Sequence, residues 1–118
     1  MKEQFVTYDV AKRLKELGFN EPCLGWIAQD EFLSTGIREV KNSDCAPKHC
    51  ASPLWQQAID WLRETKKITV GLVPYYDYFY YIIKDFNTGS EITSDEHIEK
   101  AHSILRQEAV EKALTLIE

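Results

Sequence analysis

Residues 51–83 constrain the fold more than any other stretch, because a helix signal is followed directly by a hairpin signal. Ser52 and Pro53 are typical of a helix start, where a hydroxyl caps a free N–H and proline fits the first turn. Alternating apolar segments follow at 68–73 and 78–83, joined by a short turn. The helix has four apolar residues at the spacing of one face: Trp55, Ala58, Ile59 and Leu62. The stretch therefore predicts a helix packed on a β-hairpin.

Helices are also predicted towards both ends of the chain. Thr7 is a suitable N-cap for a helix over residues 8–17, and Gly18 is a typical helix stop. Thr93 and Glu96 have the spacing of a capping box, which predicts a last helix to about residue 117. The buried stripe predicted for that helix comprises Ile98, Ala101, Leu105, Ala109, Ala113 and Leu116.

Shorter elements are predicted between the first two helices. Residues 23–28 are apolar and compatible with a strand, and residues 37–40 with another, after a turn at 34–36. Residues 42–50 are polar and contain proline, which predicts a surface loop. Gly71, inside the hairpin, predicts a bulge or a close backbone approach. The sequence thus predicts an α+β fold: a small antiparallel sheet of three to four short strands, packed on one face by three helices.

Length and composition favour a single α+β domain over residues 1–118. The chain has 44% hydrophobic residues, enough for a core without disulfides or metal. No apolar run approaches the roughly 20 residues that span a bilayer, and no signal-peptide core follows the polar residues 1–4. We therefore expect a cytoplasmic protein that does not associate with a membrane.

The charge pattern disfavours nucleic acid as the partner. The net charge is −5, from 19 acidic and 14 basic residues, and the basic residues are interleaved with carboxylates. Nucleic-acid binders usually gather lysine and arginine on one face, because phosphate contacts supply most of the affinity. A nucleic-acid-associated accessory factor remains the alternative to a protein-binding function.

Three segments together resemble a known group of proteins. They read FVTY at 5–8 with KRLKELGFNEPC at 12–23, ASPLWQQAIDWLRE at 51–64, and AVEKALTLI at 109–117. The chain resembles small uncharacterised proteins of gut Bacteroidales genomes and their prophages, over most of its length and most closely in the first two segments. The resemblance implies an accessory protein of the phage or mobile-element type, and it carries over no activity and no functional residue.

Cys45, His49 and Cys50 are the closest approach to a metal site, with Cys23 as a distant fourth ligand. Thiolate and imidazole suit zinc, but the spacing differs from the usual pairs of cysteines two to four residues apart. Adjacent ligands such as His49 and Cys50 are also difficult to direct at one ion. We therefore expect a reduced surface loop, with no metal and no cofactor.

A catalytic pair is the basis for a third function class, a small enzyme. Cys23 and a histidine would form the minimal nucleophile pair, and His97 and His102 lie on the predicted last helix. No sequence pattern places either histidine near Cys23, and His102 lies beside the apolar stripe, where packing is the commoner role. We expect no catalytic residue.

The tyrosine-rich hairpin is the candidate interaction site. Alternation places Phe79, Tyr81 and Ile83 on one side of the strand and Tyr78, Tyr80 and Ile82 on the other. These rings could pack in the core, contact a protein or stack on single-stranded nucleic acid, and the last use needs a basic surround. We favour a non-enzymatic interaction protein that binds another protein, or forms a homodimer, through Tyr75, Tyr76, Tyr78 and Tyr80.

Overall fold

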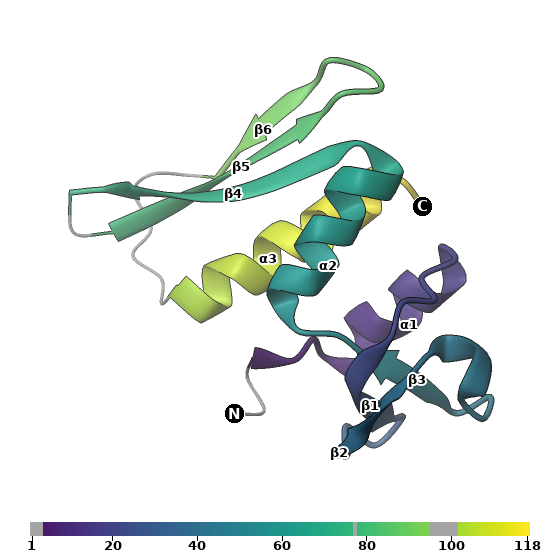
Figure 1. Cartoon of the computed structure of the whole chain (residues 1–118). Helices are drawn as coiled ribbons and strands as arrows, with labels where there is room; N and C mark the ends of the chain where they lie inside the picture. The colour runs from purple at the N-terminus through teal and green to yellow at the C-terminus, as the bar shows by residue number, and fades with distance from the viewer. Residues whose placement is uncertain (1–3, 77, 95–101) are drawn as a thin grey trace. The chain divides into compact units, whose positions relative to one another are not determined.

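The computed structural model describes residues 4–76, 78–94 and 102–118. The chain forms two compact units, Met1–Ala58 and Ile59–Glu118, and the boundary between them falls within helix α2 (Trp55–Trp61). Figure 1 shows the elements of both units. Each unit contains a small antiparallel sheet and helical segments, so the predicted α+β class is confirmed. The strands form two sheets of three rather than the single sheet of three to four that the sequence predicts. The expectation of one domain over residues 1–118 stays a prediction.

Helix α1 (Tyr8–Glu16) begins and ends as the sequence predicts. The Thr7 hydroxyl accepts a hydrogen bond from the backbone N–H of Val10 at 3.4 Å, which satisfies one of the free donors of the first turn. Gly18 has φ +96°, a conformation open to glycine without steric strain, and it terminates the helix. The backbone N–H of Phe19 then returns to the carbonyl of Leu14 at 2.9 Å, and Phe19 is buried.

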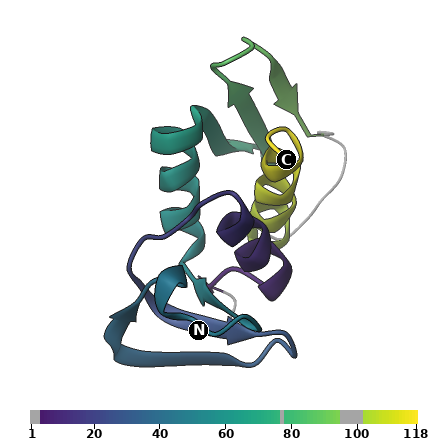
Figure 2. The ribbon, with the colours of Figure 1, turned by 90° about the vertical axis from the view of Figure 1, so that its right-hand side faces the viewer.

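The first sheet has three antiparallel strands in the order β2-β1-β3. They are β1 (Cys23–Ala28), β2 (Leu33–Val40) and β3 (His49–Ser52). In β1 the residues Cys23, Gly25 and Ile27 are buried, and α1 covers that face (Figure 2). The alternate residues Leu24, Trp26 and Ala28 lie on the opposite face.

Three local predictions in this unit are wrong. Residues 34–36 do not form a turn but continue strand β2, where pairing with β1 overrides their weak turn signal. Residues 42–50 are not only loop, because the 3-10 helix η2 (Asn42–Asp44) and the start of β3 occupy part of them. Ser52 belongs to β3, and its hydroxyl donates to the carbonyl of Val6 at 3.0 Å. It therefore does not cap the following helix, which begins at Trp55.

The predicted face of α2 is confirmed, since Trp55, Ala58, Ile59 and Leu62 are all buried. Leu62 already belongs to a π-helical segment, η3 (Leu62–Lys66), that continues α2. Lys67 adopts a left-handed conformation with φ 60° and ends it.

The second sheet contains the predicted hairpin and one further strand. Strands β4 (Ile68–Tyr75), β5 (Tyr78–Asp85) and β6 (Glu91–Thr93) are antiparallel, in the order β4-β5-β6. The β4–β5 register is unbroken, with Gly71 opposite Ile82, so the predicted bulge at Gly71 is wrong. A Cβ atom at Gly71 would meet nothing within 4 Å, so no backbone approaches closely there either. Thr93 lies in β6 rather than at a helix start.

Helix α3 (His102–Thr115) covers one face of the second sheet, as Figure 1 shows. Leu105, Ala109 and Ala113 are buried as predicted, together with Val110 and Leu114, so the buried face is broader than one stripe. Leu116 is exposed, contrary to the prediction, because it lies in the turn after the helix. The predicted positions Ile98 and Ala101 and the capping residue Glu96 lie outside the described residues. None of the helices in the described part of the chain is long and apolar enough to cross a membrane.

Candidate functional site

The second sheet has one covered and one uncovered face. Ile68 and Ile83 are fully buried on the covered face. Phe79 lies on the same face, and its ring meets the ring of His102 from α3 edge-to-face, with centroids 5.0 Å apart and planes at 83°. Tyr81 shares this face by strand alternation. The division of the strand predicted from the sequence therefore agrees with the packing of α3.

The opposite face of the sheet exposes aromatic and aliphatic side chains. Val73 on β4 lies opposite Tyr80 on β5, and Gly71 lies opposite Ile82. Four partly buried side chains on the same face as Gly71 form a surface that we call the open face: Val73, Tyr78, Tyr80 and Ile82. Because a Cβ at Gly71 would meet no atom within 4 Å beyond its chain neighbours, nothing described lies over the centre of this face.

The four tyrosines of the predicted interaction site occupy different places. Tyr78 and Tyr80 lie on the open face, and Tyr75 lies opposite Tyr78 in the strand register. Tyr76 follows β4 in the turn, has φ 57° and is 88% exposed, so it extends beyond the sheet. The structure thus brings two of the predicted rings together on one partly exposed surface.

Charge at the end of the open face is balanced. Lys84 on β5 lies opposite Glu91 on β6, and the two side chains share the face with Tyr80 and Ile82. A sheet that stacks bases on aromatic rings also needs cationic neighbours for the phosphates. A single lysine opposite a glutamate does not supply that surround, so the open face suits a protein better than a nucleic acid.

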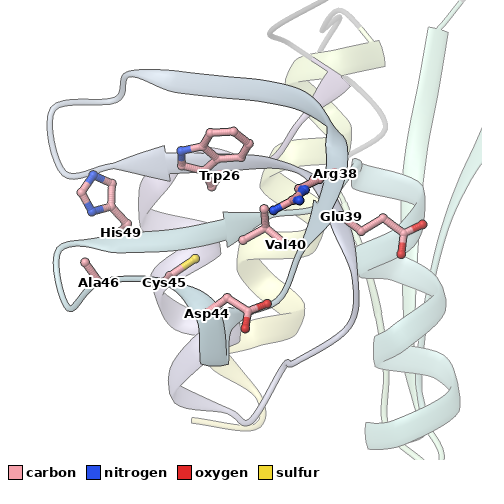
Figure 3. A pocket seen from close by; sticks show the side chains of 8 residues that line it. All are labelled: Trp26, Arg38, Glu39, Val40, Asp44, Cys45, Ala46 and His49. Atoms are coloured by element: carbon pink, nitrogen blue, oxygen red, sulfur yellow. The ribbon is translucent and has the colours of Figure 1, made fainter.

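A second site lies on the first sheet, on the face that α1 does not cover. A cleft of about 440 Å³ opens there, and Figure 3 shows the side chains that line it. Its lining comprises Trp26, Arg38, Glu39, Val40, Asp44, Cys45, Ala46 and His49. The volume is within the usual range for small-molecule sites.

An irregularity in β2 brings charged residues to this cleft. Gly25 of β1 lies opposite Thr35, yet Cys23, only two residues earlier in β1, lies opposite Val40, five residues later in β2. Strand β2 therefore carries extra residues between Thr35 and Val40, and Arg38 and Glu39 belong to this bulge. Bulges redirect side chains and are common beside functional sites.

The cleft offers three kinds of polar or aromatic contact. Trp26 supplies a flat ring, which fits closely over Gly36 because a Cβ there would lie 3.6 Å from the ring. The Arg38 guanidinium points towards Trp26 in Figure 3 and can donate to a carboxylate as a planar fork. Asp44 is held in place by the backbone N–H of Lys41, which donates to its Oδ2 at 3.2 Å, and its carboxylate can accept from a cation.

The predicted metal-ligand candidates are divided between two faces of the first sheet. His49 and Cys45 line the cleft, whereas Cys50 follows His49 in β3 and is buried on the opposite side. Successive residues of a strand point to opposite faces, which explains the separation. Within the described ranges, no three His, Cys, Asp or Glu residues are placed to hold a metal ion.

The thiols are held in the protonated form. Burial raises the pKa of Cys23 to about 12, with smaller contributions from Cys45 and nearby carboxylates. Cys23 does not line the cleft, and its Sγ donates to the carbonyl of Glu21 at 3.4 Å. Burial also raises the pKa of Cys45, although Lys15 opposes the shift. Because the thiolate is the nucleophile, this arrangement provides no activated cysteine at neutral pH. His97 lies outside the described residues.

Sequence reasoning missed the cleft, and only part of it could have been found. The alternation of Leu24, Trp26 and Ala28 against the buried residues of β1 would have placed Trp26 on the exposed face. No pattern in residues 34–40 indicates the bulge that brings in Arg38. No family model, curated protein or solved structure matches the chain, so function is inferred from these two sites.

Proposed function

We propose that this protein is a non-enzymatic interaction protein whose open face binds another protein. The observation that carries the proposal is the open space that the described residues leave above Gly71, on the face that also carries the partly exposed Val73, Tyr78, Tyr80 and Ile82. Exposed apolar surfaces of this kind mark contact sites, and tyrosine is a favoured anchor because it combines a large apolar area with a polar tip. An accessory role of the phage or mobile-element type accords with the sequence resemblance. The three cysteines are an odd number, which disfavours a disulfide framework, and we therefore propose the reducing cytoplasm as the compartment of this protein.

The test uses a photoreactive residue at the centre of the open face. Gly71 is replaced by p-benzoylphenylalanine in the full chain, produced in its native host, since nothing described occupies the space above it. Irradiation should give a covalent adduct whose mass differs from that of two crosslinked copies of this chain and that nuclease leaves intact. The same residue at the exposed Lys112 of α3 is the matched control and should not give that adduct.

A second variant shows whether the adduct depends on the open face. Combining the probe with Tyr78→Ser and Tyr80→Ser should abolish the adduct while the far-ultraviolet circular dichroism stays unchanged. Equal adduct yields with and without the two tyrosines would refute the proposal. An adduct that nuclease removes would support the alternative, a nucleic-acid-associated factor.

The cleft supports a second candidate function, the binding of a small zwitterionic molecule such as an amino acid or a peptide terminus. The specific observation is that a cation, Arg38, and an anion, Asp44, line the same cleft as Trp26. Free amino acids and short peptides titrated against the protein should quench part of its tryptophan fluorescence, and this quenching should be lost in Trp26→Phe. Arg38→Met should weaken quenching by ligands with a free carboxylate. Quenching that Arg38→Met and Asp44→Asn leave unchanged would refute this function.

A further inference from the structure

Strand β4 forms an outer edge of the second sheet with almost none of the usual protection. Its eight residues, ITVGLVPY, include no charged side chain, and its pairing with β5 contains no bulge. Native edge strands are commonly protected from pairing by lysine, proline, bulges or short length. Here Pro74 interrupts the far end only, which leaves residues 68–73 without any such feature. Strand β6, on the other side of the sheet, is only three residues long.

The outward backbone groups of β4 can be identified from one hydrogen bond. The N–H of Phe86 donates to the carbonyl of Lys67 at 2.9 Å, so Lys67 directs its backbone towards the chain of β5. Because backbone groups alternate along an antiparallel strand, Thr69, Gly71 and Val73 do the same. Ile68, Val70 and Leu72 therefore direct their N–H and C=O groups outward, where no described strand pairs with them.

We infer that a second copy of this chain pairs antiparallel with this edge, strand β4 against strand β4. A two-fold axis at Val70 places Ile68 of each copy opposite Leu72 of the other, so every outward group of the three residues is paired. The same strand can satisfy itself in this way because it carries no charge that would repel its copy. Pro74 stays outside the paired segment.

The open face explains why a second copy fits better than an unrelated peptide. At the junction, Gly71 of one copy lies beside Thr69 of the other, and both are small, so the two open faces join without a steric clash. The dimer would present one continuous sheet with its tyrosines on one side. This inference extends the proposed function, because the joined open faces remain available to the other protein.

The test compares the oligomeric state of three full-length proteins by sedimentation equilibrium between 5 and about 500 µM. The unmodified chain should form a dimer. Val70→Pro removes an outward N–H and no bond to β5, so it should raise the dimer dissociation constant at least about tenfold with unchanged circular dichroism. Tyr78→Ser combined with Tyr80→Ser should leave the dimer intact.

A second variant keeps the test valid if proline disturbs the strand. Gly71→Lys places its side chain in open space, so each copy should fold, but two added charges would lie beside the two-fold axis. It should dissociate the dimer at low salt and recover at high salt, because salt screens exposed charges. Gly71→Ala is the matched uncharged control and should stay dimeric.

The outcomes separate this inference from the proposed function. A dimer that survives Val70→Pro and Gly71→Lys but is lost in the double tyrosine variant would refute edge pairing and favour face-to-face contact through the open face. A chain that is monomeric at about 500 µM would also refute edge pairing, without affecting the photo-crosslinking result at position 71.

Discussion

Replacing Asn42 with alanine should destabilise the first unit more than the loss of a single polar side chain usually does. Asn42 is buried at 6% exposure in η2, and its amide joins two segments of the chain. Its Nδ2 donates to the carbonyl of Phe19 at 2.7 Å, just after α1, and its Oδ1 accepts from the N–H of Ala51 in β3 at 2.9 Å. Both partners are buried, so alanine would leave one buried acceptor and one buried donor unpaired.

The magnitude follows from the desolvation of those two groups. Each buried group left without a partner costs about 1–3 kcal/mol, and water that enters the space would recover part of this. We therefore expect Asn42→Ala to lower the free energy of unfolding by about 2–4 kcal/mol. With a urea m-value of about 1.5 kcal/mol/M, the midpoint should fall by roughly 1.3–2.7 M.

The assay follows tryptophan fluorescence in urea, since Trp26 and Trp55 lie in the same unit as Asn42. Ser43→Ala is the matched control, because Ser43 is exposed and its backbone N–H keeps its bond to Asn20. Asn42→Asp keeps the acceptor for Ala51 but loses the donor to Phe19. Its loss of stability relative to the unmodified protein should therefore be smaller at low pH, where the protonated carboxyl can donate to the Phe19 carbonyl again. A midpoint for Asn42→Ala within about 0.3 M of the unmodified protein would refute the reasoning.

Three further predictions follow from single groups. Hydrogen bonds from Asn87 and Thr88 hold the pKa of Asp85 below its usual 3.8. The ionised carboxylate therefore stabilises the fold above that pH, and this stabilisation is lost as the pH falls through the lower folded pKa. On acidification, the free energy of unfolding of Asp85→Asn should fall less than that of the unmodified protein. Because burial raises the pKa of Cys23 to about 12, its protonated thiol contributes stability that is fully present below pH 9 and is lost as the pH rises towards about 12. Between these pH values the free energy of unfolding of Cys23→Ala should fall less than that of the unmodified protein. Gly25→Ala would place a Cβ 2.9 Å from the Phe5 ring and should cost about 1–3 kcal/mol in urea denaturation, whereas Gly71→Ala should change stability by less than about 0.5 kcal/mol.

The elements that could be predicted from sequence are those with local signals. Helix α1 has its own cap at Thr7 and its own stop at Gly18, and both signals act within a few residues. The β4–β5 hairpin alternates over neighbouring segments joined by a two-residue connection, so its register needs no distant partner. Such signals are visible in the sequence because the residues that make them are close along the chain.

The elements that could not be predicted depend on distant partners. Strand β3 is only four residues long and includes His49 and Ser52, and it is a strand because β1 pairs with it. In the sequence Ser52 resembles a helix cap, but in the fold its hydroxyl donates a hydrogen bond to the carbonyl of Val6, 46 residues earlier. The cleft has the same origin, since Arg38 reaches it through a register shift between two strands. Alternation in the sequence predicts which residues share the open face, but it does not predict the space that the described residues leave open over Gly71.

The attachment of the N-terminal segment to the chain ahead of α2 affects the order in which this protein can fold during synthesis. The N–H of Val6 donates to the carbonyl of Pro53 at 3.0 Å, and Phe5 forms a bridge with Leu54. These partners emerge from the ribosome only after the intervening 46 residues, which takes about 2–9 s at 5–20 residues per second. During that interval Phe5 and Val6 lack their native cover, while α1 can already form. The β4–β5 hairpin has no comparable delay, because its strands are synthesised one after the other and hairpins form within microseconds.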